Sequence, residues 1–241
     1  MVAFDGAHVV VTGGTGALGT AVVAALRAAG AVCHVTNIKA AELDTWPHRH
    51  DAGVHVTTGL DLADEAAVRR FYGALPALWG SVHLAGGFAM SPAAETSAAA
   101  FADQFQMNAL SAFLCSAAAV RAIRERAAPG PEGCKGGRIV NVAARPGLEP
   151  RLGSGMVAYA TAKAAVAAMT QALAQETAGE EIWVNAVAPS ILDTPANRSA
   201  MPGADYASWV APSAVAEIIT FLASPDNRST RGAVIPVYGG A

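Results

Sequence analysis

The apolar positions along the chain follow two alternating patterns. Short runs rich in valine, isoleucine and threonine alternate with longer alanine-rich segments in which apolar residues recur with a helical period. The short runs predict seven strands, at residues 7–12, 31–36, 54–58, 82–84, 138–142, 183–187 and 234–237. The longer segments predict helices at residues 17–29, 64–74, 102–126, 157–178 and 212–223.

This alternation is typical of βαβ units, in which parallel strands are joined by helical crossovers. It predicts an α/β, Rossmann-type three-layer fold: a seven-stranded parallel sheet with helices on both faces. The chain has 241 residues, 53% of them apolar, which is enough to fill one large core. We therefore expect a single domain over residues 1–241.

The charge pattern narrows the possible partners. The net charge is -3 and lysine and arginine form no cluster, so we expect neither nucleic acid nor an anionic membrane as a partner. The N-terminal residues lack the pattern of a signal peptide, and no apolar run is long enough to span a bilayer. The three cysteines and the scattered histidines have no metal-ligand spacing, which predicts reduced thiols, no metal site and a cytoplasmic protein.

A glycine-rich segment, TGGTGALG at residues 12–19, connects the first predicted strand to the first predicted helix. Gly14, Gly16 and Gly19 satisfy the pattern GxGxxG in this setting. Glycine allows a tight turn and a close approach to a pyrophosphate, whose charge is stabilised by the helix N-terminus. The segment therefore predicts a dinucleotide-binding site.

The end of the second predicted strand is where a residue meets the adenosine ribose. Asn37 holds that position, in the segment VTNIK. An aspartate there would repel a 2′-phosphate, whereas Asn37 lacks the charge and Lys39 could attract the phosphate. NADP is thus mildly favoured over NAD, unless Lys39 is an ordinary solvated lysine.

The segment YATAK places Tyr159 and Lys163 four residues apart in a predicted helix. Residues at this spacing share one helix face, so the ammonium can lie close to the phenol. A neighbouring positive charge stabilises a phenolate and lowers the tyrosine pKa from its usual value near 10. The pair is either an acid catalyst with its tuning cation or a chance spacing on a helix surface.

Further segments occur in a characteristic order. They are Asp61-Leu62, Ala85-Gly86-Gly87, Asn108 within QMNALSAF, and VNAVAPSILDTP after the sixth predicted strand. Together with the glycine turn and YATAK, they make the chain resemble the short-chain dehydrogenase/reductase family over essentially its whole length.

The resemblance implies an NAD(P)H-dependent oxidoreductase acting on a small-molecule carbonyl, imine or pterin-like substrate. Tyr159 would be the general acid/base, Lys163 would hold the nicotinamide ribose, and Asn108 would bend its helix to hold a proton-relay water. Asp61 and Leu62 would contact the adenine, and residues 189–194 would hold the carboxamide. The implied cofactor-binding residues are Gly13, Gly14, Thr15, Gly16, Leu18, Gly19, Asn37, Lys39, Asp61, Leu62, Ala85, Gly86, Gly87, Tyr159, Lys163, Pro189, Ile191 and Thr194.

The chain departs from the family pattern at two positions. Ala17 replaces a glycine of the commonest turn pattern, a small change that we expect to be tolerated. Ala144 stands where the family has a serine that hydrogen-bonds the substrate carbonyl. Losing one such donor can lower a rate by about 10² to 10³. Either Ser154 substitutes for the serine, or the substrate is electrophilic enough without it, or the protein is a cofactor-binding sensor that does not catalyse.

The segment LDTPANRSAMPGADYASW, together with AGGF and GMVAYATAK, is similar to the dihydropteridine reductases, which also lack the serine. The similarity implies a substrate-side lid at about residues 190–211 and a quinonoid dihydropterin as substrate. Asn108 and Asn37 do not fit that subfamily.

Other residues near the predicted site allow two interpretations. Met201, Tyr206 and Trp209 form an apolar lid over a flat substrate or simply pack onto the domain. Arg145 and Arg151 face an anionic or pterin-like ligand or lie on the surface. The alanine-rich helices at 102–126 and 157–178 permit close packing, and the resemblance implies a homodimer or homotetramer formed through them.

Overall fold

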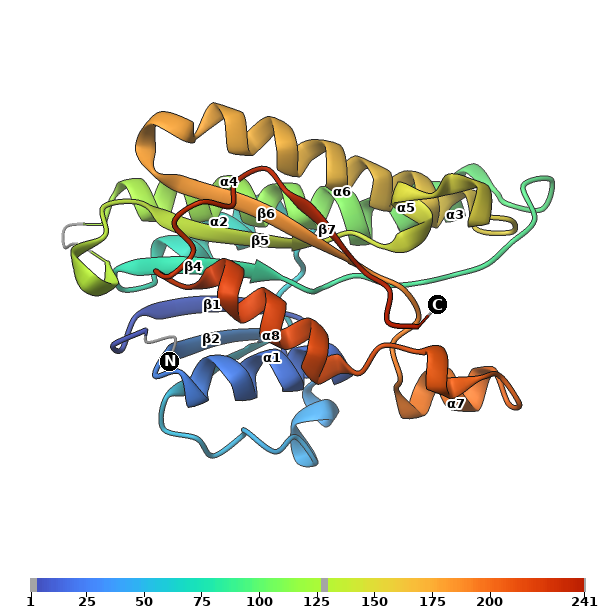
Figure 1. Ribbon diagram of the computed structural model, residues 1–241, viewed down its shortest axis with the longest axis horizontal. Coiled ribbons are helices and arrows are strands. Elements are labelled where there is room, and N and C mark those ends of the chain that lie inside the picture. Colours follow the sequence, from blue (N-terminus) through green and yellow to red (C-terminus); the bar gives the residue numbers. More distant parts are fainter. Residues whose placement is uncertain (1–3, 127–129, 241) are drawn as a thin grey trace.

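The computed structural model describes residues 4–126 and 130–240 (Figure 1). Residues 1–3, 127–129 and 241, which belong to the predicted domain, lie outside the described part. Seven parallel strands form one sheet in the order β3-β2-β1-β4-β5-β6-β7. They are β1 (His8–Thr12), β2 (Val32–Asn37), β3 (Val54–Thr58), β4 (Leu78–His83), β5 (Gly137–Val142), β6 (Ile182–Pro189) and β7 (Val234–Val237).

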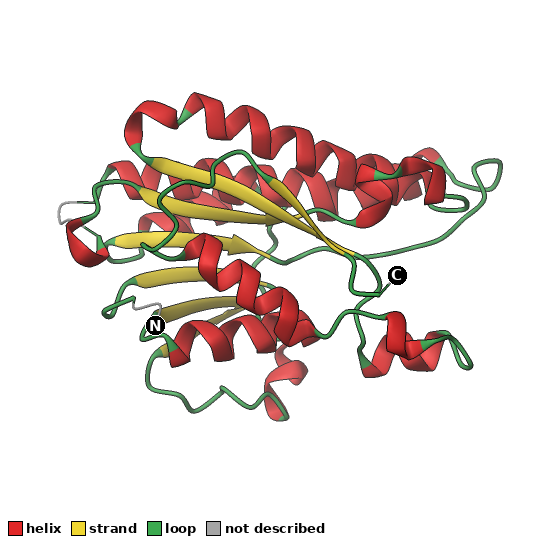
Figure 2. Ribbon diagram, viewed as in Figure 1, coloured by secondary structure: helices red, strands yellow, loops and turns green. Residues whose placement is uncertain are grey.

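Helices cover both faces of the sheet, as the red layers above and below the yellow strands show (Figure 2). On one face, α1 (Ala17–Ala28) packs against α8 (Pro212–Ala223). The other face carries α2 (Glu65–Gly73), α4 (Ser111–Arg124) and α6 (Val157–Glu176). The predicted three-layer Rossmann-type fold is therefore confirmed.

The core explains why the strands read as continuous apolar runs. A parallel sheet covered on both faces buries the side chains of its central strands, and β4 is buried along its whole length. Val9 and Val11 pack toward α1 and α8, while Val10 packs on the opposite face. Small residues form a third cluster between α4, α6 and the carboxyl ends of β5 and β6, namely Ala109, Ala112, Ala143, Ala162, Val166, Ala167 and Ala188. Their size lets the helices approach the edge where the strands end.

Several element boundaries differ from the predicted ones. β4 begins at Leu78 instead of residue 82. The sequence prediction started the strand too late because glycine, here Gly80, is uncommon inside strands. In the structure Gly80 allows a close approach of β5. A Cβ at Gly80 would lie 3.1 Å from the carbonyl oxygen of Arg138. The predicted helix at 102–126 is instead α3 (Ala98–Phe105), a π-helical turn η2 (Gln106–Leu110) and α4. Ser97 starts α3 early, because its Oγ accepts the Ala100 amide at 3.1 Å.

Short helices escaped the sequence prediction. They are η1 (Ala40–Asp44), η3 (Pro131–Gly133), α5 (Arg145–Leu148), η4 (Pro150–Leu152), η5 (Ala178–Glu180), α7 (Pro195–Ala200) and η6 (Tyr206–Ser208). A segment of three to six residues completes too few turns to display a helical period. None of the described helices combines the length and apolar character that crossing a membrane requires.

A buried polar network joins the centre of the sheet to α6. His83 Nε2 lies 2.8 Å from Ser81 Oγ, and His83 Nδ1 lies 2.8 Å from Asn141 Oδ1. Asn141 Nδ2 in turn donates to Thr170 Oγ1 at 3.0 Å. Burial lowers the pKa of His83 from 6.5 to about 4, although the hydrogen bond with Asn141 acts in the opposite direction.

This histidine should make the fold sensitive to acid. Between about pH 6.5 and 4 the unfolded chain binds a proton at residue 83 that the folded protein excludes, so the free energy of unfolding falls as the pH falls. Well inside that window His83 contributes a slope of about 1.4 kcal/mol per pH unit. In urea unfolding between pH 7 and pH 4.5, His83→Gln should reduce the slope by about this amount. An equal pH dependence of the free energy of unfolding in the parent and in His83→Gln would contradict this role of His83.

Candidate active site

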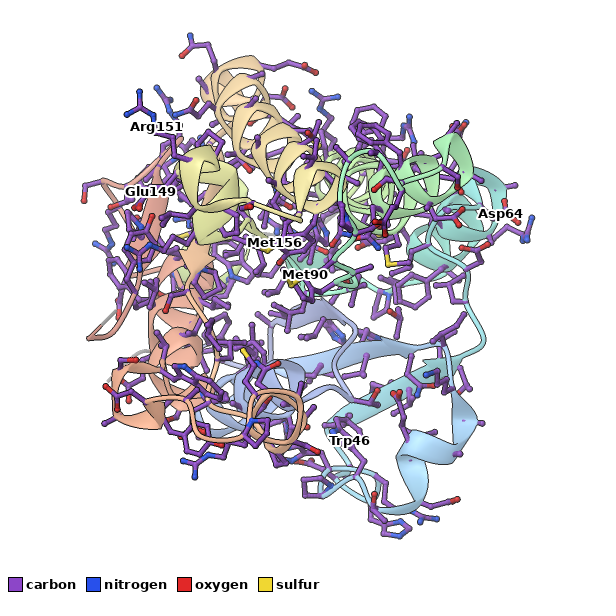
Figure 3. All side chains as sticks on the ribbon, turned by 90° about the vertical axis from the view of Figure 1, so that its right-hand side faces the viewer. Trp46, Asp64, Met90, Glu149, Arg151 and Met156 are labelled. Carbon is purple, nitrogen blue, oxygen red and sulfur yellow. The ribbon has the colours of Figure 1, made fainter. Side chains whose placement is uncertain are left out.

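The carboxyl ends of the parallel strands meet at one edge of the sheet, on the right of Figure 1, where α7 and the loop after β4 extend beyond it. Figure 3 looks onto this edge. Met90 and Met156 lie beside one another near its centre (Figure 3), and the Ser91 amide donates to the Gly155 carbonyl at 2.8 Å. The loop after β4 is therefore tied to the loop that precedes α6.

The glycine turn closes tightly against β4. Gly13 has a φ of +65°, and a Cβ there would lie 3.0 Å from Ala85 Cα. Gly19 permits α1 to pack on the turn, because a Cβ would collide with the backbone of Gly13 and Gly14. Gly16 precedes α1 in extended conformation, is exposed and supplies no capping side chain. The first amides of α1 are thus presented to the edge, where they favour an anion.

A cavity of about 270 Å³ lies beside this turn. Its lining residues are Gly13, Thr15, Gly16, Thr36, Asn37, Ile38, Glu42, Leu60, Leu62, Leu84, Ala85 and Gly86. The predicted cofactor residues Gly13, Thr15, Gly16, Asn37, Leu62, Ala85 and Gly86 are among them. Its position at the ends of β1 and β2 matches the adenosine half of a dinucleotide site.

Other residues predicted for this half have different surroundings. Gly14 is buried, and a Cβ there would lie 2.7 Å from Val35 Cγ1, so this glycine serves strand packing. Leu18 packs against the core under α1. Lys39 and Asp61 are exposed and do not line the cavity, and Asp61 Oδ1 accepts the Ala63 amide at 2.9 Å. The structure thus gives Asp61 a turn-forming role.

Tyr159 and Lys163 lie on α6, facing the ends of β4 and β5. Lys163 Nζ is 5.9 Å from the centre of the Tyr159 ring and donates to the Val142 carbonyl at 2.9 Å. Lys163 is only 6% exposed. The Tyr159 ring is partly buried and meets the ring of Phe88 edge to face, with 5.0 Å between centroids. The i, i+4 spacing therefore brings the two groups together as expected.

Burial controls the ionisation of both groups. It raises the pKa of Tyr159 from 10.0 to about 12 and lowers the pKa of Lys163 from 10.5 to about 8. The sequence predicted that Lys163 lowers the tyrosine pKa. In the structure that lowering is absent, because desolvation of the phenolate dominates. At neutral pH the phenol is protonated and the lysine carries its charge.

Asn108 lies inside the π-helical turn η2, which separates α3 from α4. Its Nδ2 donates to the carbonyls of Gly87 at 2.9 Å and Gln104 at 3.0 Å, and its Oδ1 accepts the Gly87 amide at 3.3 Å. A Cβ at Gly86 would lie 2.6 Å from Asn108 Oδ1 and 3.5 Å from Lys163 Nζ. Gly86, Asn108 and Lys163 therefore converge, and π-helical turns of this kind are frequent at functional sites.

The position of the missing serine is buried. Ala144 is 5% exposed and immediately precedes α5, whose Gly147 packs so closely on α6 that a Cβ would lie 2.7 Å from the Lys163 carbonyl carbon. Ser154, the predicted substitute, is exposed. Residue 144 therefore offers no hydroxyl to a substrate, and the replacement of the family serine by Ser154 stays a prediction.

The two arginines near the site have surroundings of their own. Arg145 Nε lies 3.2 Å from Glu149 Oε2, and its guanidinium stacks 4.6 Å from the centre of the Tyr238 ring. Arg151 points away from the molecule, far from Met90 in Figure 3. Arg145 is partly buried and paired within the protein, Arg151 is exposed, and neither lines the cavity.

The predicted lid segment, residues 190–211, begins just after β6 ends at Pro189. Ile191 is 42% exposed, whereas Thr194 is buried and accepts the Asn197 amide to start α7. The Tyr206 ring packs against Trp209 in a tilted arrangement, with 4.8 Å between centroids, and the Tyr206 hydroxyl donates to the Met201 carbonyl at 3.2 Å. Pairing of Leu192 with Val210 closes the segment at its base.

Sequence reasoning missed two neighbours of the site. Glu42 lines the cavity although it follows β2 in a segment without periodicity. Phe88 covers one edge of the Tyr159 ring, and only its place in AGGF hinted at a role. Within residues 4–126 and 130–240, no group of three histidine, cysteine or acidic side chains is arranged to hold a metal ion.

Comparison with known proteins agrees with this geometry. A family model described as short chain dehydrogenase matches residues 7–204. Galactitol 2-dehydrogenase of Rhizobium johnstonii is 32% identical over 255 residues, covering 98% of this chain and 95% of that protein. L-xylulose reductase of Bos taurus is 29% identical over 245 residues, covering 98% and 96%. A 3-oxoacyl-[acyl-carrier-protein] reductase of Thermotoga maritima is 37% identical, but over only 44% of this chain and 46% of its own length.

Solved structures share the fold. A short-chain type dehydrogenase/reductase from Mycobacterium ulcerans superposes with a TM-score of 0.86 at 23% identity, covering 99% of this chain and 90% of that one. Actinorhodin polyketide ketoreductase with NADPH gives a TM-score of 0.83 at 24% identity, covering 100% and 98%. The chain belongs to the short-chain dehydrogenase family, and it is by class an NAD(P)-dependent oxidoreductase.

The convergence at Gly86 can be tested by adding one methyl group. Gly86→Ala should displace Asn108 or Lys163 and lower kcat/KM by about tenfold or more, because displacements near 1 Å at a site are costly. Gly73→Ala is the control, since a Cβ there meets nothing within 4 Å and alanine favours a helix. Steady-state kinetics and thermal melts of both variants measure the effect. Full activity in Gly86→Ala would show that the three residues do not form one site.

Proposed function

We propose that the chain transfers hydride between a bound nicotinamide and a carbonyl or imine/quinonoid carbon, with Tyr159 as general acid/base. One observation carries this proposal: the buried Lys163 ammonium lies beside the Tyr159 ring, at the same strand edge as the glycine turn and its cavity. Neither the cavity nor the pair would be decisive alone. Their position on one edge, in a chain of this family, supports a redox site.

The residues on this edge fit a dinucleotide. Gly13 and Gly19 leave no room for a Cβ, and α1 begins with amides open to a pyrophosphate. Asn37 contributes a buried amide oxygen that finds no hydrogen-bond partner among the described residues. Lys163 would hold the nicotinamide ribose, and residues 189–194 would lie beside the ring. The dinucleotide supplies the hydride, while the protein orients the reactants and supplies the proton.

The ionisation of the pair suits a reduction. The phenol of Tyr159 remains protonated at neutral pH, so it can donate its proton to the oxygen or nitrogen of the substrate. The phenolate that remains is stabilised by the Lys163 ammonium, which retains its charge below about pH 8. Asn108 would position a proton-relay water behind the lysine. Phe88 packs against the phenol ring edge to face.

The substrate must tolerate the missing serine. The methyl group of Ala144 gives no hydrogen bond to a developing oxyanion. A quinonoid dihydropterin, or another electron-poor imine, demands less of that stabilisation, which supports a dihydropteridine reductase as the alternative function. The same residue supports a second alternative, a cofactor-binding sensor without catalysis. Whether the enzyme is a general carbonyl or imine reductase or a dihydropteridine reductase, the segment 190–211, with Met201, Tyr206 and Trp209, would act as its substrate-side lid.

Cofactor choice, assembly and location complete the proposal. Asn37 and Lys39 favour NADP(H), and the polyketide ketoreductase noted above has NADPH bound. Glu42, however, brings a carboxylate to the same cavity and acts in the opposite direction. A homodimer or homotetramer is supported by the exposed Phe101, Phe105 and Phe113 on α3 and α4. A cytoplasmic location remains a prediction from the cysteines.

Replacement of the phenol tests catalysis directly. Tyr159→Phe should lower kcat by about 10² to 10⁴, the usual range for a general acid, and should leave the Kd for the dinucleotide within about threefold. Tyr238→Phe is the matched control, because its ring stacks on Arg145 instead of Phe88. Turnover is followed by oxidation of NADH and NADPH with ketones, imines and quinonoid dihydropterin. A parent protein that binds dinucleotide but turns over none of these substrates would support the sensor.

Restoring the family's hydroxyl tests the role of Ala144. Ala144→Ser should raise kcat/KM for an ordinary ketone by about tenfold or more, because it adds an oxyanion donor. For a quinonoid dihydropterin the change should be below about threefold. Ala143→Ser adds the same atom at the neighbouring buried position and should not raise ketone reduction. An unchanged ketone rate in Ala144→Ser would contradict this explanation of the substrate class.

A further inference from the structure

The carboxylate of Glu42 occupies the end of the cavity where an adenosine ribose would bind. Thr15 Oγ1 donates to Glu42 Oε2 at 2.6 Å, and Asn37 Nδ2 lies 3.4 Å from the same oxygen. Thr15, Asn37 and Glu42 all line the cavity. The carboxylate thus stands beside the last residue of β2, where a dinucleotide-binding protein meets the ribose hydroxyls.

Asn37 adds a second acceptor to this end. Its Nδ2 donates to the Lys39 carbonyl at 2.6 Å, so the amide oxygen is the end of the side chain that lacks a partner. Asn37 is only 4% exposed, and that oxygen is buried without a hydrogen-bond partner within the described part of the chain. Buried acceptors are almost always hydrogen-bonded, so an unpaired one lining a cavity points to a ligand donor. A neutral amide oxygen beside a carboxylate matches a diol.

The segment that carries Glu42 is held on α1. Trp46 is 4% exposed, and its Nε1 donates to Thr20 Oγ1 at 3.1 Å. Arg27 on the same helix forms an ion pair with Asp51 at 3.0 Å. Figure 3 shows Trp46 below the sheet edge, on the segment that follows β2. These contacts hold the chain after η1 against α1, and the hydrogen bond from Thr15 holds the Glu42 carboxylate beside the cavity.

We propose that Glu42 is the residue that selects the cofactor, making the chain specific for NAD(H) against NADP(H). This inference rests on the proposed function. The Glu42 carboxylate would accept a ribose hydroxyl, as an aspartate at position 37 would have done, and it would repel a 2′-phosphate. Lys39 is exposed and does not line the cavity, whereas Glu42 does. The charge of Glu42 therefore outweighs that of Lys39, and the preference for NADP(H) drawn from Asn37 and Lys39 is reversed to NAD(H).

Equilibrium binding of NADH and NADPH to the purified full chain tests this inference without any substrate. The parent should bind NADH about tenfold or more tightly than NADPH. Glu42→Gln removes the charge, keeps an acceptor and should narrow that ratio by about tenfold, chiefly by tightening NADPH binding. Asp44→Asn is the matched control, because Asp44 belongs to the same short helix η1 and does not line the cavity. It should leave the ratio within about twofold.

The salt dependence provides a second readout. Glu42 is exposed, so added salt should screen its charge and narrow the ratio in the parent more than in Glu42→Gln. Tighter binding of NADPH than of NADH by the parent would overturn the inference. Equal ratios in Glu42→Gln and Asp44→Asn would overturn it as well, while leaving the proposed function intact. Failure of the parent to bind either dinucleotide would overturn the proposed function itself.

Discussion

The buried ammonium of Lys163 is the constraint around which the strand edge is built. A charged amine removed from water is unfavourable unless nearby groups compensate, and the Val142 carbonyl accepts from it at 2.9 Å. Its surroundings are shaped to admit it. Gly147 lets α5 pack against its backbone, and Gly86 lets the loop after β4 approach its Nζ. Substituting either glycine would push side chains into the same small space.

This constraint also determines how Tyr159 can work. Burial keeps the phenol protonated, with a pKa of about 12, and lowers the lysine pKa to about 8. The attraction between the two becomes important only once the phenol has lost its proton. The lysine therefore favours the state that follows proton donation, which is where stabilisation accelerates a reaction. A neighbour that lowered the pKa of the resting phenol would contribute less to the rate of a reduction, because less of the phenol would carry the proton to be donated.

Local patterns were enough to predict the framework. Continuous apolar strands and the glycines at 14, 16 and 19 define a parallel sheet with a dinucleotide turn, because each depends on neighbours in sequence. The spacing of Tyr159 and Lys163 predicted their proximity for the same reason. Their pKa values could not be predicted, since burial depends on the packing of α5, α6 and the loop after β4.

What remained unpredictable depends on contacts distant in sequence. Glu42 reaches the cavity in a segment where Trp46 packs on Thr20 of α1. Residues 38–53 have no helical or strand periodicity of apolar positions that would predict this contact. The π-helical turn forms where Asn108 exchanges hydrogen bonds with Gly87, 21 residues earlier. Gly147 lets the short helix α5 pack closely on α6, a contact that no local sequence pattern predicts.

The most direct test of the account is nitrogen NMR of the lysine side chains, with and without NADH. The chain contains only three lysines, Lys39, Lys135 and Lys163, so Lys163→Arg assigns the signal of interest. The account predicts that this signal titrates near pH 8 in the free protein and shifts when NADH is added. A Lys163 signal that titrates like a solvated lysine, or that does not respond to NADH, would contradict it.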